Sequence, residues 1–326
     1  MKVLVTGATG FLGQEVLKRL PDGIAACRSP EKLVGFIGEV RVGDLRDPHY
    51  REAVVQGVDA VVHCGTWSSL WGHAQQEADW FYHPTLELIS ACRRAGVSRF
   101  LLPSTVSIAK PSREEISSRG PTAPTGFWPH LDYLVALDEH MQQVATAATG
   151  MVTLRLGHFV GPGNTVGLVP ALVPRLRTHL VPWLGDGTRR MPLVGVADLA
   201  DGIVRAATAQ NLEPYESFQL CGPEFPTTDE VFSRIAACAE VSPPWFRVPY
   251  SAAMAFGWLM ERVPLRFAGS PFLTQSIVHL ARDWYTPSTE AERRLGYAPT
   301  QDWRELVAEA VAQVEGWTAL TQATDP

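Results

Sequence analysis

Lys2-Val3-Leu4-Val5-Thr6-Gly7-Ala8-Thr9-Gly10-Phe11-Leu12-Gly13 decides the fold, because strand-forming residues lead directly into the spacing Gly-x-x-Gly-x-x-Gly. The next residues carry leucine and valine at helical spacing, so the stretch reads as a strand, a glycine turn and a helix. Such a unit binds a dinucleotide pyrophosphate, because glycines allow a tight turn and close approach of backbone N–H groups to the phosphates. Glycines also end strands in proteins that bind nothing, and it is the position after the first strand that favours a dinucleotide site here.

The composition is that of an ordinary globular protein. The chain has 326 residues, of which 46% are hydrophobic and 19% charged, and its formal net charge of -6 argues against general nucleic-acid binding. Its five cysteines are odd in number and form no Cys-x-x-Cys pair, which is typical of reduced thiols in a cytoplasmic protein. The first predicted strand starts at residue 2, so no signal peptide is expected, and no apolar run approaches the ~20 residues of a membrane span.

Strand and helix patterns alternate through the first half of the chain. Strands are predicted at 2–6, 24–27, 40–42, 60–64, 100–103 and 153–156, and helices at 50–56, 85–95 and 134–148. Alternation with short connections predicts an α/β fold, a Rossmann-type doubly wound parallel sheet with helices on both faces. Ligands of such sheets bind beyond the carboxyl ends of the strands, so these ends are expected to surround one crevice.

The amino-acid composition changes after Gly161-Pro162-Gly163, where prolines become frequent. We expect a dinucleotide-binding Rossmann domain of residues 1–160 plus 190–222 and a smaller, irregular substrate-binding lobe of residues 161–189 plus 223–326. Residues 191–196 are expected to be a strand that returns to the main sheet, followed by a helix capped by Asp198.

Further motifs follow the glycine turn in a fixed order. They are Val42-Gly43-Asp44-Leu45-Arg46-Asp47, Val61-Val62-His63-Cys64-Gly65-Thr66, Ser68-Ser69-Leu70-Trp71-Gly72, Arg155-Leu156-Gly157-His158-Phe159-Val160-Gly161-Pro162-Gly163 and Arg293-Arg294-Leu295-Gly296-Tyr297-Ala298-Pro299. Together they resemble the extended short-chain dehydrogenase/reductase superfamily, its NAD-dependent epimerase/dehydratase group, and within it the 3β-hydroxysteroid dehydrogenase-like branch.

The resemblance implies a nicotinamide cofactor and the residues that contact it. These are Gly7, Thr9, Gly10, Phe11, Leu12, Gly13, Arg28, Asp44, Leu45, Cys64, Gly65, Thr66, Tyr133 and His158. No metal site is expected.

The end of the second predicted strand bears on the choice of cofactor. NAD sites usually carry an acidic residue there for the ribose 2′-OH, whereas NADP sites use Arg. The tip of this strand is Cys27-Arg28-Ser29. We therefore expect NADP, with NAD as the second choice, although Arg28 could also be a solvated surface charge.

The family's catalytic residues are a Ser or Thr hydroxyl, a Tyr and a Lys four residues after the Tyr. The resemblance places the hydroxyl at Thr105, with Ser104 beside it, and the Tyr at Tyr133. The Lys position then falls on Leu137, and the position of a supporting Asn falls on Phe81. The active site is therefore expected to be atypical, since the lysine that lowers the tyrosine pKa and holds the nicotinamide ribose is absent.

Other proton carriers lie close in sequence to these positions. His130 precedes Tyr133, and His158 lies in the segment that borders the nicotinamide pocket in the family. Imidazole is a natural acid or base near neutral pH, although a lone histidine beside a helix is more often a cap or a surface residue.

The expected substrate is a small hydrophobic molecule, because aromatic and apolar residues fall near the strand ends. The candidates for an apolar wall are Trp67, Trp71, Trp128, Phe127, Leu168, Trp183, Met254 and Phe256. The first hypothesis is an NAD(P)-dependent oxidoreductase, an NADPH-dependent reductase of a hydrophobic carbonyl compound. Two alternatives remain, a non-catalytic NAD(P)-binding sensor or scaffold and a non-redox isomerase, cyclase or lyase on the same fold. A homodimer through the helices 85–95 and 134–148 is an option that internal packing explains equally well.

Overall fold

The computed structural model describes residues 1–165, 167–263 and 271–324. A seven-stranded parallel sheet forms its centre, in the order β10-β6-β5-β4-β1-β2-β3. The strands are β1 (Val3–Thr6), β2 (Ile24–Cys27), β3 (Val40–Val42), β4 (Ala60–His63), β5 (Arg99–Thr105), β6 (Gly150–Leu156) and β10 (Tyr215–Leu220). This is the Rossmann-type arrangement predicted from the alternating pattern, and the strand order reverses between β1 and β4.

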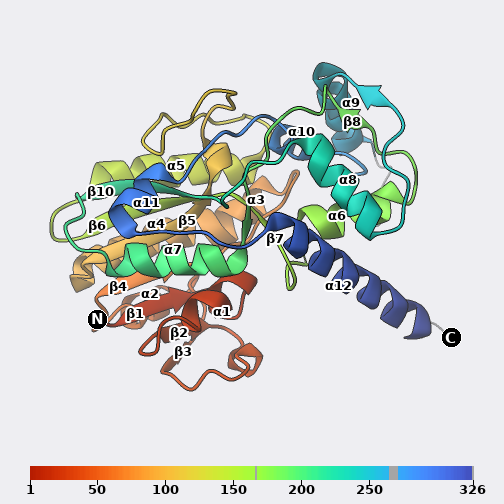
Figure 1. The fold of residues 1–326 in the computed structure, drawn as a ribbon. Coiled ribbons are helices and arrows are strands. Elements are labelled where there is room, and N and C mark those ends of the chain that lie inside the picture. Colours follow the sequence, from red (N-terminus) through yellow and green to blue (C-terminus); the bar gives the residue numbers. More distant parts are fainter. Residues whose placement is uncertain (166, 264–270, 325–326) are drawn as a thin grey trace.

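Helices cover both faces of the sheet (Figure 1). One face packs against α1 (Phe11–Leu17), α7 (Val196–Thr208) and α11 (Thr289–Leu295), and the other against α2 (Pro48–Val54), α4 (His83–Ala95) and α5 (Pro129–Val144). Because both faces are covered, the central strands are continuous apolar runs rather than alternating ones: all four residues of β1 are buried.

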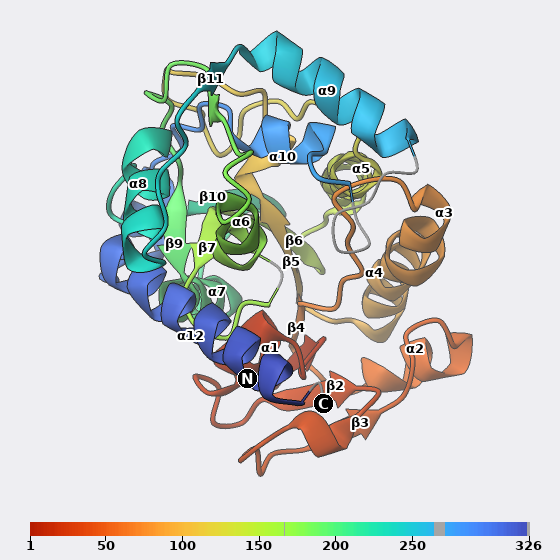
Figure 2. The ribbon, with the colours of Figure 1, turned by 90° about the vertical axis from the view of Figure 1, so that its right-hand side faces the viewer.

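A second group of elements lies across from the carboxyl ends of the strands, as Figure 2 shows for α6, α9 and α10. They are α6 (Leu168–Leu176), β8 (Trp183–Leu184), α8 (Thr228–Cys238), β11 (Arg247–Val248), α9 (Tyr250–Arg262), α10 (Gln275–Leu280) and α12 (Trp303–Thr324). Helices α6, α8 and α12 share a hydrophobic cluster of their own. The division of the chain into two domains stays a prediction.

One strand was assigned to the wrong sheet. The expected strand 191–196 exists as β9 (Leu193–Gly195), but it pairs with β7 (His158–Val160) in a separate two-stranded sheet. The reason is that β10, which the sequence pattern did not reveal, pairs with β6 along its whole length and occupies that edge. Asp198 does not cap α7 either, since its carboxylate accepts the N–H groups of Thr300 and Gln301.

Helix α5 begins five residues before its predicted start at Leu134. Pro129 occupies its first turn, where the missing N–H costs nothing because the first helical N–H groups have no partner within the helix. The additional turn brings His130 into the helix, one turn before Leu134.

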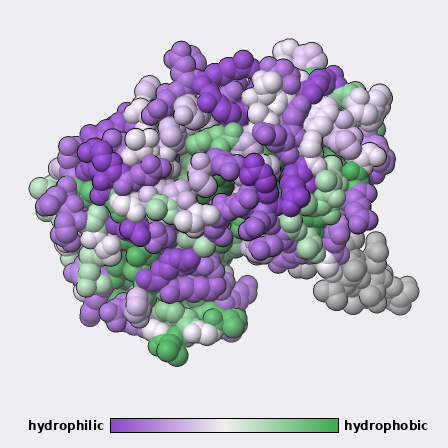
Figure 3. All heavy atoms as spheres, viewed as in Figure 1, coloured by the Kyte–Doolittle hydropathy of each residue, from purple (hydrophilic) through white to green (hydrophobic). Residues whose placement is uncertain are grey.

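The surface is mixed in character (Figure 3): hydrophobic groups are scattered over a mainly hydrophilic face. Within the described residues, no helix is long and apolar enough to cross a membrane.

Candidate active site

One large cavity opens at the carboxyl ends of the strands. Its volume is about 1490 Å³, and its lining runs from the glycine turn after β1 to α9 and α10. Residues 84 and 85 of α4, the end of β5, and His130 and Leu134 of α5 line its middle. The crevice expected at the strand ends is therefore a single continuous space.

The glycine turn forms one wall of the cavity with bare backbone. Gly7 has a φ of 63°, and a Cβ added there would lie 2.5 Å from the amide nitrogen of Gly65 in the segment after β4. A Cβ on Gly13 would lie 2.3 Å from the carbonyl oxygen of Gly7. Both positions therefore exclude any side chain, and this allows the turn to pack closely against the segment after β4 and the start of α1.

Nearly all predicted cofactor residues line this cavity. They are Gly7, Thr9, Gly10, Phe11, Leu12, Gly13, Arg28, Asp44, Leu45, Cys64, Gly65, Thr66 and His158. Tyr133 is not among the lining residues. Their binding to a cofactor stays a prediction.

Two arginines and a tryptophan form one corner of the cavity, beyond the ends of β2 and β3. The guanidinium of Arg46 lies 3.7 Å from the centre of the Trp80 ring and bonds Asp44 at 2.6 Å. Arg28 lies 5.8 Å from the same ring and 4.0 Å from Asp44. The hydrogen bond from Arg46 holds the pKa of Asp44 below its usual range. This corner thus carries two cations against one carboxylate.

Tyr133 points away from the cavity. Its hydroxyl donates to the carbonyl oxygen of Ala74 at 3.3 Å, and its ring stacks on Tyr82 with centroids 4.7 Å apart. Leu137, the expected position of the missing lysine, is fully buried in the core beneath the sheet. Helix α5 instead contributes His130 and Leu134 to the lining of the cavity. These two residues are four positions apart, as Tyr133 and Leu137 are.

His130 is paired with a carboxylate that no sequence pattern singles out. Its Nδ1 lies 2.9 Å from Oε2 of Glu77, at the end of α3 (Ala74–Glu77), and the Glu77 side chain is fully buried. The other carboxylate oxygen accepts the N–H of Ser69 at 2.7 Å. Only the fold reveals this pair, because 53 residues separate its members.

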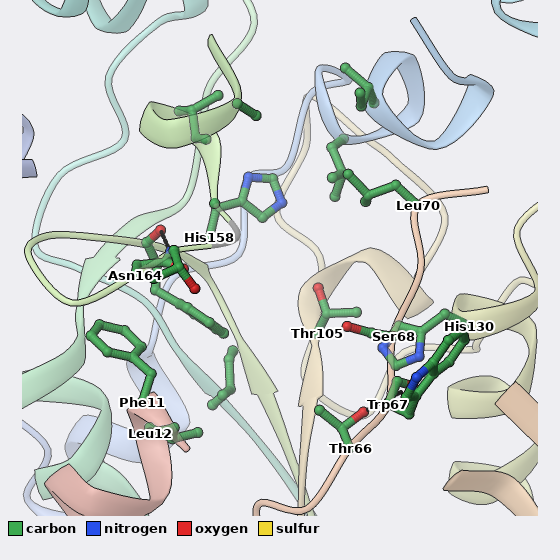
Figure 4. A pocket seen from close by; sticks show the side chains of 18 of the residues that line it. Phe11, Leu12, Thr66, Trp67, Ser68, Leu70, Thr105, His130, His158 and Asn164 are labelled. Carbon is green, nitrogen blue, oxygen red and sulfur yellow. Dashed lines mark hydrogen bonds between the residues drawn. The ribbon is translucent and has the colours of Figure 1, made fainter. Parts of the chain in front are cut away.

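The centre of the cavity collects hydroxyl and imidazole groups (Figure 4). Thr105 and Ser68 lie between His158 on one side and His130 on the other. The Thr105 hydroxyl oxygen accepts the N–H of Ser107 at 3.2 Å, so its own proton remains available to a ligand. Ser104 also lines the cavity, and its hydroxyl has no partner among the described residues.

His158 is neutral over the ordinary pH range. Burial, together with the neighbouring His279, lowers its pKa to about 4. Its Nε2 lies 3.5 Å from the Ser107 hydroxyl. At neutral pH it can therefore hold or orient a ligand by hydrogen bonding but cannot supply a positive charge.

The expected apolar wall is present in part. Of the residues named from the sequence, the cavity is lined by Trp67, Trp128, Leu168 and Phe256, but not by Trp71, Phe127, Trp183 or Met254. Other apolar side chains from α6, α9, α10 and the segment before α10 complete this end, among them Leu172, Ile277 and Phe272. Among the described residues, no cluster of three or more His, Cys, Asp or Glu side chains could hold a metal ion.

Protein stability should depend on pH through His63, which ends β4 and lines the cavity. Burial lowers its pKa to about 4, against ~6.5 in an unfolded chain. Below pH ~6.5 the His63 imidazole is therefore protonated in the unfolded state, whereas in the folded state it stays neutral down to about pH 4. We expect the free energy of unfolding to fall as the pH drops from ~6.5 to about 4, and to fall less steeply in His63→Gln.

Urea titrations at several pH values in this window measure that slope. His49, which is exposed, supplies the control variant His49→Gln, which should keep the wild-type slope. Equal slopes in the two variants would contradict the assignment to His63.

Three comparisons relate this chain to known proteins. The model of the NAD dependent epimerase/dehydratase family matches residues 3–221. A 2-alkyl-3-oxoalkanoate reductase of Stenotrophomonas maltophilia is 28% identical over 316 residues, which cover 92% of this chain and 95% of the relative. A 3 beta-hydroxysteroid dehydrogenase/Delta 5-->4-isomerase of Mycobacterium tuberculosis is 25% identical, over 95% of this chain and 89% of the relative.

A solved structure shares the fold. The UDP-glucose 4-epimerase of Thermus thermophilus in complex with NAD superposes with a TM-score of 0.70. The match covers 97% of this chain and 99% of that one at 20% sequence identity, so it speaks to the fold alone.

Proposed function

The chain belongs to the NAD dependent epimerase/dehydratase family, and we propose that it is an NADPH-dependent reductase of a hydrophobic carbonyl compound. The observation that carries the proposal is the single cavity. It joins the bare glycine turn at one end to an apolar wall at the other, and His130, Thr105 and His158 lie between them.

The residues present fit a nicotinamide dinucleotide. The backbone of the glycine turn, including Gly7, Gly10 and Gly13, lines the cavity on the side where the pyrophosphate of such a cofactor lies in this fold. Arg28 and Arg46, beyond the ends of β2 and β3, can hold the 2′-phosphate of NADP, and Trp80 offers a flat apolar surface beside them. These contacts favour NADPH over NADH.

The proposal places the family's Tyr and Lys positions at His130 and Leu134, three residues before the expected ones. Both pairs have the four-residue spacing, but only His130 and Leu134 line the cavity. The chain has no lysine at either place, so the departure from the family pattern remains. The catalytic role predicted for Tyr133 stays a prediction that its position does not favour.

The chemistry follows from this arrangement. When bound, the reduced nicotinamide supplies a hydride to the carbonyl carbon. The protonated ring of His130 donates its Nε2 proton to the carbonyl oxygen as that oxygen gains negative charge. Thr105 donates a hydrogen bond to the same oxygen and orients it. His130 regains a proton from water after the alcohol leaves.

The apolar end of the cavity indicates the class of substrate. Side chains such as Leu172 and Phe256 can bury alkyl chains or fused rings. Arg175 also lines the cavity, but its guanidinium donates hydrogen bonds to the carbonyl oxygens of Ala171 and Phe272. The names of the two relatives, which concern a 2-alkyl-3-oxoalkanoate and a 3β-hydroxysteroid, are consistent with a ketone in apolar surroundings.

The test is nicotinamide absorbance with NADPH or NADH and two probe substrates, a 2-alkyl-3-oxoalkanoate and a 3-oxosteroid. Loss of absorbance that depends on either substrate supports the proposal. NADPH binding without turnover points to the sensor alternative, and substrate conversion without a change in absorbance points to an isomerase or lyase. Failure to bind either nucleotide contradicts the proposal altogether.

Arg28→Ala is expected to weaken NADPH binding about tenfold while NADH binding changes little. A charged hydrogen bond to a phosphate contributes roughly 1.5–3 kcal/mol, and exposure of the Arg28 side chain reduces that gain. Fluorescence titrations with both nucleotides measure the ratio, and Lys32→Ala serves as the control. An equal loss of NADPH and NADH affinity would show that Arg28 does not read the 2′-phosphate.

A further inference from the structure

We propose that Glu77 is the positioning residue for His130, holding its ring so that Nε2 faces the cavity and can deliver a proton. This inference rests on the proposed function, because it gives the mechanism by which His130 replaces the family's tyrosine. Nothing in the sequence comparison assigns Glu77 a role.

The two carboxylate oxygens of Glu77 have different partners. Oε2 of Glu77 faces Nδ1 of His130 at 2.9 Å, and Oε1 accepts the Ser69 N–H at 2.7 Å. The hydrogen bond to His130 needs one proton, and the proposal places that proton on Nδ1. Glu77 thus offers an acceptor at each of its two terminal atoms. A glutamine amide at the same place offers an acceptor at only one of them, because its other terminal atom is a donor.

The backbone that follows Glu77 has an unusual conformation beside its contact with His130. Glu77 ends α3, and one turn of π-helix, η2 (Ala78–Tyr82), follows directly. Such turns are rare and often occur at functional sites. The turn places Phe81 with its ring centroid 5.6 Å from that of His130, and Trp128 lies 6.4 Å away, so two aromatic rings lie beside the imidazole.

The pair decides which nitrogen is free. With Nδ1 committed to Glu77, the remaining nitrogen, Nε2, is the one left to the cavity that His130 lines. When His130 is protonated, the carboxylate of Glu77 compensates its charge inside the protein. The Nδ1–H group then donates to Glu77, and the Nε2–H group is left to the cavity. A purely structural role, in which Glu77 only secures the Ser69 N–H, makes no demand on the His130 tautomer.

Nitrogen NMR of 15N-histidine-labelled protein distinguishes the two roles, with His130→Gln used to assign the signals. In the wild-type protein the neutral ring of His130 should carry its proton on Nδ1. In Glu77→Gln, which is nearly isosteric, the proton should leave Nδ1, and kcat should fall on the order of 10²-fold with little change in KM. Glu77→Leu should show the same tautomer change and a loss at least as large.

Asp79→Asn provides the matched control, since Asp79 lies two residues away, is exposed and bonds only Gln75 among the described contacts. It should leave both the tautomer and kcat as in the wild type. A His130 tautomer that is unchanged in Glu77→Gln overturns the proposal. If the wild-type protein reduces no carbonyl compound, the proposed function fails, and the NMR result still decides whether Glu77 sets the tautomer.

Discussion

Replacement of His130 by alanine is expected to lower kcat for carbonyl reduction about 10²–10⁴-fold, the usual contribution of a general acid. The reason is that, among the described residues, no other imidazole lies on the cavity wall with a buried carboxylate behind it. Steady-state oxidation of NADPH measures the effect. Cofactor affinity should stay within a few-fold, because Leu134 and the glycine turn are untouched.

Tyr133→Phe is the control for this prediction. Its hydroxyl bonds the carbonyl of Ala74 outside the cavity, so removal of that oxygen should change kcat less than about twofold. Loss of activity in Tyr133→Phe with normal activity in His130→Ala would contradict the role of His130 and would indicate that Tyr133 is the proton donor.

The second large effect is expected for Gly7→Ala, which should weaken NADPH binding more than about tenfold and destabilise the protein. The left-handed conformation at φ 63° costs a residue with a Cβ roughly 1–2 kcal/mol. The new Cβ would also lie 2.5 Å from the Gly65 amide nitrogen and 2.6 Å from the Cys64 carbonyl carbon, both backbone atoms. The ends of β1 and β4 would have to separate, and both ends line the cavity.

Gly57→Ala separates these two costs. Gly57 has a φ of 67° but no atom within 4 Å of an added Cβ, so only the conformational cost applies. We expect about 1–2 kcal/mol of lost stability in urea titrations and unchanged NADPH affinity. If both variants lose the same stability and neither loses affinity, the close approach of β1 and β4 has no part in the cofactor site.

The sequence was sufficient for the sheet and the glycine turn, because both depend on local patterns. Apolar runs with helical stretches between them predict buried parallel strands. The spacing of the glycines indicates positions at which the backbone tolerates no side chain. The edge strand β10 was missed, since its residues Glu216, Ser217 and Gln219 interrupt the apolar run although all are buried. Buried polar residues with tertiary partners, such as Glu216 with Arg294, cannot be recognised from a local pattern.

The contacts within the candidate site were less accessible from the sequence, because they depend on helix register and on segments that are distant in the chain. The start of α5 was predicted five residues too late. The tyrosine position was assigned to Tyr133 from the resemblance to the family motif, and its catalytic role stays a prediction. In the structure, the helix turns that tyrosine onto Tyr82 and brings His130 to the cavity. Glu77 could be found only once α3 and α5 were placed side by side.

The most direct test of hydride transfer in this cavity uses NADPH that carries deuterium at C4 of the nicotinamide. The protein is incubated with this cofactor and a 2-alkyl-3-oxoalkanoate or a 3-oxosteroid, and the product is examined by mass spectrometry. We predict an alcohol with one deuterium on the former carbonyl carbon, formed in step with NADP⁺ and about 10²-fold or more slowly by His130→Ala. A protein that binds NADPH but forms no deuterated alcohol from either substrate would contradict the proposed reduction.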